Sequence, residues 1–147
     1  MKADTKSSQA EKEQIPKDED TILITRLSFY IGGYGGPSYS LELSLSDGKW
    51  QEKALLYDRA YYRKEAPPQP LFPSPGLSLA AWLSEWDELN VSSWKERYEN
   101  PRCLDGTQWS LEYEENGVRH ESGGSNRHPR GWRKFMNWLH KRYPEIR

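Results

Sequence analysis

The chain has 147 residues, with 21 lysines and arginines against 22 aspartates and glutamates, and a formal net charge of -1. This length suffices for one domain with a buried core, and the near-neutral charge argues against a protein whose whole surface binds polyanions. Only 35% of the residues are apolar, yet seven are Trp and nine are Tyr. Because aromatic rings each bury a large area, we expect a core that is rich in aromatic side chains.

Cysteine content and the N-terminal composition both indicate a cytoplasmic protein. Cys103 is the single cysteine, which excludes an intramolecular disulfide and a cysteine-rich metal site. Residues 1–20 hold six acids and four lysines and lack the apolar run of a signal peptide or a membrane span. We therefore expect a disordered tail at 1–20, a single domain at 21–147, and no membrane association.

Alternating apolar residues predict three strands in the first half of the chain. The first covers about 22–31 and the second about 39–46, where Leu and Tyr alternate with Ser and Glu. The Asp47-Gly48 pair is a typical two-residue hairpin turn, and a weaker third strand follows over about 50–57. This pattern predicts an antiparallel sheet with one face in solvent.

The glycine-rich segment 32–36 separates the first two strands. A phosphate-binding loop leads into a helix and often carries a lysine, whereas this segment has no lysine and leads into a strand. The sequence therefore favours a hairpin loop. The tyrosines of this region, Tyr34 and Tyr39, form a secondary candidate contact loop.

Five prolines within residues 66–76 predict an extended connector without regular structure, because proline removes a hydrogen-bond donor and fixes φ. After it, Ser78 has the position of a cap for a helix whose apolar stripe runs from Leu79 to Leu89. A second short helix is expected over about 91–98.

The second half of the chain predicts another hairpin. Trp109, Leu111 and Tyr113 alternate with polar residues, and the Asn116-Gly117 pair marks the turn. Counting across this turn pairs Tyr113 with His120, so His120 is expected on the inner face. The flanking pairs are Glu114 with Arg119 and Glu115 with Val118.

A final helix is expected from Pro129, a favoured first helical residue, to Pro144. Its predicted buried residues are Trp132, Phe135, Met136, Leu139 and Tyr143. Together the elements predict the α+β class: a single domain with an antiparallel sheet of about five strands and two main amphipathic helices packed on one face.

One pattern in the second half consists of Asp-Gly, a strand with Trp-x-Leu, a Gly-x-Asn loop and a helix entered through Pro-x-x-Trp. It resembles a family of small uncharacterised bacterial proteins grouped as a domain of unknown function, over about 22–143. The resemblance implies an α+β fold and a bacterial origin, brings no catalytic residues, and suggests an immunity role by similarity of type. The residues that carry it are Asp105, Gly106, Trp109, Leu111, Gly124, Asn126, Pro129, Trp132 and Phe135.

Charge is distributed unevenly along the chain. Residues 119–147 hold eight lysines and arginines against two acids, a net charge of +6, so the remainder carries -7. Arg127, Arg130 and Arg133 surround the start of the final helix, where free N–H groups and the helix dipole favour an anion. The alternative is that Ser125 or Asn126 caps the helix and that the arginines are simply solvated.

The same helix also permits an interpretation as a nucleic-acid-binding element. Arg130, Arg133 and Lys134 lie opposite its buried stripe, together with Lys141, and Trp138 is expected on the flank. Basic residues beside an aromatic ring can contact phosphates and stack on a base. A solvated basic face explains the same residues, and the acidic remainder of the chain weakens this interpretation.

Reaction chemistry is not indicated by any motif. His120, His128 and His140 lack metal-ligand spacing, and neither Cys103 nor any serine stands in a nucleophile motif. We therefore expect a protein without catalytic residues, metal or cofactor.

We expect a non-enzymatic binding protein, a bacterial immunity or antitoxin-like inhibitor with an acidic protein partner. The candidate partner-binding or anion-binding residues are Arg127, Arg130, Arg133, Lys134 and Trp138. Two alternatives stay open: a nucleic-acid-associated module that uses the basic C-terminal helix, and an unrecognised enzyme.

Overall fold

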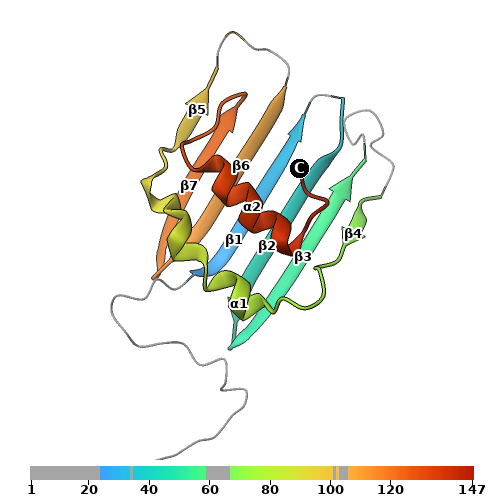
Figure 1. The fold of residues 1–147 in the computed structure, drawn as a ribbon, viewed down its shortest axis with the longest axis vertical. Coiled ribbons are helices and arrows are strands. Elements are labelled where there is room, and N and C mark those ends of the chain that lie inside the picture. Colours follow the sequence, from blue (N-terminus) through green and yellow to red (C-terminus); the bar gives the residue numbers. More distant parts are fainter. Residues whose placement is uncertain (1–23, 34, 59–66, 101, 103–105) are drawn as a thin grey trace, which may run out of the picture.

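A computed structural model describes residues 24–33, 35–58, 67–100, 102 and 106–147. The described residues form one sheet with helices on a single face (Figure 1). The expected tail at 1–20 lies outside them. The elements in chain order are β1 (Ile24–Gly33), β2 (Ser38–Ser46), β3 (Lys49–Tyr57), β4 (Gln69–Leu71), α1 (Leu79–Leu83), η1 (Trp86–Leu89), η2 (Val91–Ser93), β5 (Arg97–Glu99), β6 (Thr107–Glu115), β7 (Val118–Ser125) and α2 (Trp132–Arg142).

The α+β class is confirmed, with α1 and α2 on the same face of the sheet (Figure 1). The strand order is β4-β3-β2-β1-β6-β7-β5, and β5 runs parallel to β7 while all other pairs are antiparallel. The prediction of about five antiparallel strands is therefore wrong in detail, because the described part of the chain forms a mixed sheet of seven strands.

The two additional strands are the short edge strands β4 and β5. β4 lies within the proline-rich segment 66–76, where an edge strand tolerates proline because its outer side needs no donor. β5 lies where a helix over 91–98 was predicted; only its first turn forms, as η2. Beyond η2, Gly123 donates its N–H to the Glu96 carbonyl and Ser122 donates its hydroxyl to the Lys95 carbonyl, which aligns the chain with β7.

Both predicted hairpins form, and the second has the expected register. Tyr113 pairs with His120, Glu114 with Arg119, and Glu115 with Val118. Asn116 and Gly117 have φ of 52° and 83°, the left-handed pair that a tight hairpin turn requires.

One register detail in β1 escaped the sequence pattern. Strict alternation from Leu27 places Ile24 on the solvent face, yet Ile24 is buried. A β-bulge between Ile24 and Arg26 inserts one extra residue and returns Ile24 to the core face.

The core between sheet and helices is aromatic, as expected. Trp82 and Trp138 stack in parallel with ring centroids 4.0 Å apart, and each indole N–H donates to the other residue's backbone carbonyl, at 2.7 and 2.8 Å. Trp109 is buried as predicted, whereas Trp132 is only partly buried. The Trp82–Trp138 pair fastens α1 to α2.

A partly buried ion pair anchors the end of α2 to the sheet. Arg142 contacts both carboxylate oxygens of Glu52 in β3, at 2.7 and 2.8 Å, and the Tyr143 hydroxyl donates to the same carboxylate. Burial alone raises the pKa of Glu52, but the hydrogen bonds from Arg142 and Tyr143 outweigh it and hold that pKa below its usual value.

The first predicted helix is shorter than its apolar stripe. Ser78 caps α1 as predicted, accepting the Ala81 N–H at 3.1 Å. The chain leaves the α-helical path after Leu83 and continues as the separate 3-10 turn η1. Trp86 and Leu89 are nevertheless buried, so both pieces pack on the sheet.

Candidate functional site

The final helix begins three residues later than Pro129, its predicted first position. The Pro129 carbonyl accepts the Trp132 N–H at 3.1 Å in a turn that precedes α2. Gly131 is the N-cap residue, with a left-handed φ of 91°, and no side chain caps the helix. The alternative in which Ser125 or Asn126 caps it is wrong, because the turn at Pro129 separates both residues from the helix.

Four cations surround this helix start, and we call Arg127, Arg130, Arg133 and Lys134 the basic surface. All four are exposed. They lie at the end of α2 that covers β6 and β7 (Figure 1). Within the described ranges none of them forms an ion pair. The sequence therefore located this group of cations, and the structure brings them to one end of one helix.

Some cations elsewhere in the described chain form ion pairs, whereas other exposed ones there, such as Lys49, Lys53 and Lys95, form none. What distinguishes the basic surface is that four cations without an ion pair to the described residues gather at one helix start. The ion pairs join Arg119 to Glu112 and Glu121, Lys141 to Glu85, Arg97 to Glu99, and Arg142 to Glu52. The basic surface thus carries positive charge that carboxylates in the described chain leave uncompensated.

The backbone under the basic surface is held by the core. The Trp109 indole N–H donates to the Arg127 carbonyl at 3.0 Å, and the Trp132 ring lies 4.7 Å from the Trp109 ring. His128 stacks on the outer side of Trp132 at 4.4 Å. Burial lowers the pKa of His128, so this ring is neutral at neutral pH.

The aromatic residue predicted for this surface was Trp138, and that prediction is wrong. Trp138 is 2% exposed and stacks on Trp82, so it cannot contact a partner. The aromatic pair beside the cations is instead His128 on Trp132. Helical periodicity places Trp132 and Trp138 on opposite flanks of the same buried stripe, and contacts with distant residues decide which flank is covered. Trp82 and Trp86 cover Trp138.

The prediction of a secondary contact loop at Tyr34 and Tyr39 is wrong for Tyr39, and Tyr34 lies outside the described residues. Tyr39 pairs with Ile31 and Leu56 on the core face of the sheet and packs partly buried against the core. Its side chain therefore contributes to packing and not to an exposed loop.

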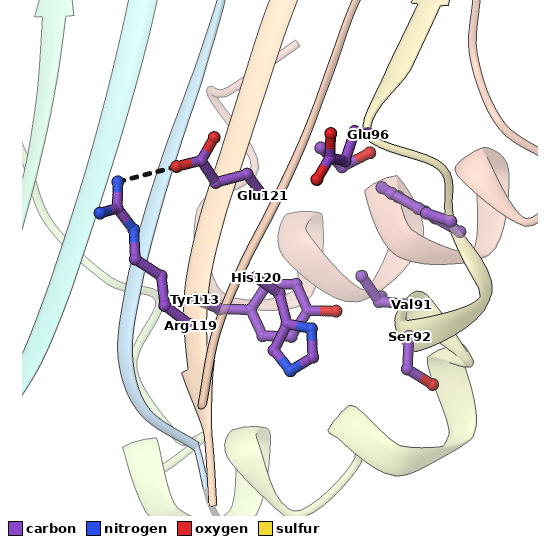
Figure 2. A pocket seen from close by; sticks show the side chains of 9 residues that line it. Val91, Ser92, Glu96, Tyr113, Arg119, His120 and Glu121 are labelled. Atoms are coloured by element: carbon purple, nitrogen blue, oxygen red, sulfur yellow. Dashed lines mark ion pairs between the residues drawn. The ribbon is translucent and has the colours of Figure 1, made fainter. Parts of the chain in front are cut away.

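A pocket of about 370 Å³ lies between β7 and η2, and we call it the Tyr–His pocket. Figure 2 shows His120 over the Tyr113 ring and the Tyr113 hydroxyl directed toward Val91 and Ser92. The two rings stack 4.9 Å apart with 13° between their planes. His120 therefore faces inward beside Tyr113, as the predicted register requires.

Glu115 lies beside this pocket and is 8% exposed. Burial raises its pKa and Asp87 adds to the effect, while His120, at 3.9 Å, and a hydrogen bond from Trp86 oppose it. Burial and the nearby Glu115 carboxylate raise the pKa of Tyr113 to about 12. Tyr113 therefore keeps its proton at neutral pH and can donate a hydrogen bond.

Other candidate chemistry finds little support in the described ranges. No three His, Cys, Asp or Glu side chains there gather as metal ligands, and Cys103 lies outside those ranges. The Ser122 hydroxyl, which faces the Tyr–His pocket, already donates to the Lys95 carbonyl at 2.6 Å. Among the described helices, none has the length and apolar character needed to cross a bilayer.

Comparisons with protein-family models, curated proteins and solved structures find no match to this chain. The suggested family resemblance therefore stays a prediction.

Proposed function

We propose that this protein is a non-enzymatic binding protein that engages an acidic protein partner through the basic surface. The observation that carries the proposal is four exposed cations, without carboxylate partners in the described chain, around a helix start without a side-chain cap. Such a surface favours encounter with a negatively charged partner and disfavours positively charged ones.

The helix dipole supports the same preference. Arg133 and Lys134 lie in the first turn of α2, where like charge opposes the positive end of the dipole. A partner carboxylate placed there relieves this repulsion and can accept hydrogen bonds from the free N–H groups of the first turn. Each favourable charge at a helix end is worth roughly 0.3–1 kcal/mol at an exposed site.

The surface is also prepared for binding by its attachment to the core. Trp132 packs on Trp109, and the Arg127 backbone accepts a hydrogen bond from Trp109. A backbone that is already ordered loses less conformational entropy on binding. This property suits an inhibitor that covers a partner's surface, as an immunity or antitoxin-like protein of bacteria does.

Affinity capture from the native host tests the proposal. The parental protein is compared with Arg130→Glu/Arg133→Glu and with a matched control, Lys49→Glu/Lys53→Glu, which makes the same charge change at exposed residues of β3. We expect one acidic protein to be retained by the parental protein and by the control and lost with the first variant. Equal retention by all three proteins would refute the role of the basic surface.

A nucleic-acid partner is the second candidate, and the His128–Trp132 pair favours it because a half-exposed aromatic stack beside cations can receive a base. Fluorescence anisotropy with a labelled single-stranded oligonucleotide and a polyglutamate peptide of equal charge separates the candidates. Trp132→Leu should weaken oligonucleotide binding strongly if stacking contributes. An effect of the arginine variant alone supports the protein partner.

A further inference from the structure

The face of the sheet opposite the helices carries a second candidate surface. A groove of about 670 Å³ extends over β1, β6, β7 and β5 on this face. Its floor is low because Gly123 lies between Ser110 of β6 and Arg97 of β5 and has no side chain to fill it. The groove is therefore built from small residues at the centre of three paired strands.

The sides of the groove are rich in carboxylates. Glu96, Glu99, Glu112 and Glu121 line it, whereas Arg97 is the one lining cation among the residues that the structure describes. Arg119, at the end of the groove, pairs with Glu112 and Glu121 at 3.0 and 2.9 Å. With both arginines counted, four negative charges stand against two positive ones. The groove is therefore acidic, in contrast to the basic surface.

An aromatic ring completes the groove. Tyr30 of β1 lines it and is 40% exposed, and its hydroxyl donates to Ser38 at 3.1 Å. The ring lies along β1 over Gly32, because a Cβ at Gly32 would come within 2.7 Å of the Tyr30 hydroxyl oxygen. An exposed tyrosine ring beside carboxylates is the combination that attracts lysine and arginine side chains.

We infer that the groove binds an extended, lysine- or arginine-bearing peptide segment of a second partner. The Tyr30 ring lies over Gly32, which pairs with Gln108, and Glu112 is four residues further along β6 on the same face. Four residues of a strand span about 13–14 Å. The first and fifth residues of an extended peptide have nearly the same spacing. One cationic side chain can therefore lie on the Tyr30 ring while another, four residues along the peptide, meets Glu112.

Fluorescence anisotropy with a labelled ten-residue peptide of alternating lysine and serine tests this inference on the full chain. Glu112→Gln/Glu121→Gln and Tyr30→Ala should each weaken binding, the first about tenfold at low salt. Arg119→Gln should tighten binding severalfold, because it releases both carboxylates from their ion pair. A purely structural role of Arg119 predicts no such gain.

A matched control variant and the shifts of backbone amide signals on peptide binding decide whether the groove is the binding site. Glu88→Gln/Glu145→Gln makes the same charge change at exposed residues outside the groove lining and should leave the affinity unchanged. In nitrogen-15 NMR spectra the peptide should shift the amides of Ser110 and Gly123. Equal weakening by the control, shifts confined to the start of α2, or absence of binding would overturn the inference.

Discussion

Aromatic stacking in this core brings the buried N–H groups of Trp82 and Trp138 within reach of hydrogen-bond partners, whereas the buried Trp94 indole N–H has no partner among the described residues. The indoles of Trp82 and Trp138 each bury an N–H, and each finds the other residue's carbonyl. A buried N–H without a partner costs about 1–3 kcal/mol, so the reciprocal arrangement removes two such penalties at once. This pair gives two of the seven tryptophans a structural role.

Trp138→Ala should lower the free energy of unfolding by about 3–5 kcal/mol, since it deletes a buried ring and leaves the Trp82 stack open. Urea denaturation measures the effect. Phe72→Ala is the control. Because Phe72 is 74% exposed, this variant should unfold near the parental urea midpoint. An unchanged midpoint for Trp138→Ala would mean that this pair does not hold the helices together.

Two carboxylates, the partly buried Glu52 and the buried Glu115, should give opposite pH dependences. The fold lowers the pKa of Glu52, so its stabilisation is complete above the unfolded-state pKa and is lost as pH falls through the folded-state pKa. The fold raises the pKa of Glu115, so ionisation of Glu115 costs stability as pH rises through the unfolded-state and folded-state values.

Urea denaturation between pH ~3 and ~7 therefore separates the two residues. Glu52→Gln should be most destabilising at neutral pH and approach the parental stability in acid. Glu115→Gln should gain stability relative to the parental protein as pH rises. Parallel pH curves for Glu115→Gln and the parental protein would show that this carboxyl titrates normally.

At the scale of elements, the sequence motif with Gly-x-Asn has a structural explanation. Asn126, with φ of 58°, accepts the Thr107 N–H through its side chain at 3.0 Å and donates its own N–H to the Thr107 carbonyl at 2.8 Å. Its side chain occupies the space where a Cβ of Gly106 would lie. The motif joins the start of β6 to the end of β7.

Gly124 permits close packing at the same end of the sheet. A Cβ at Gly124 would come within 2.6–2.7 Å of the Trp109 indole nitrogen and the carbonyl oxygens of Tyr98 and Arg127. Gly124→Ala should destabilise by about 1–3 kcal/mol or more, measured by thermal and urea unfolding. Gly36→Ala, where a Cβ meets nothing within 4 Å, should stay within about 0.5 kcal/mol of the parental protein.

Elements that depend on local patterns could be predicted from the sequence, and elements that depend on distant contacts could not. The β6–β7 register follows from alternation and the Asn116-Gly117 turn. β5 forms because a three-residue segment with no strand pattern of its own pairs with the edge of β7. The four cations were identified from charge alone, whereas the partial burial of Trp132 depends on distant residues such as Trp94 and Trp109 that pack against it.

At the scale of the whole molecule, helices cover one face of the sheet, and the basic surface lies at one end of this layer (Figure 1). The opposite face carries the acidic groove. A net charge of -1 therefore conceals two surfaces of opposite sign. Such separation lets a single small protein discriminate between partners by charge.

The association rate of the captured acidic partner, followed by stopped-flow fluorescence over a range of ionic strength, tests the proposed role of the basic surface most directly. With the parental protein the rate should fall steeply as salt rises. With Arg130→Glu/Arg133→Glu it should be at least about tenfold slower at low salt and approach the parental rate at high salt. Equal rates for both proteins at low salt would contradict the claim that the basic surface binds the partner.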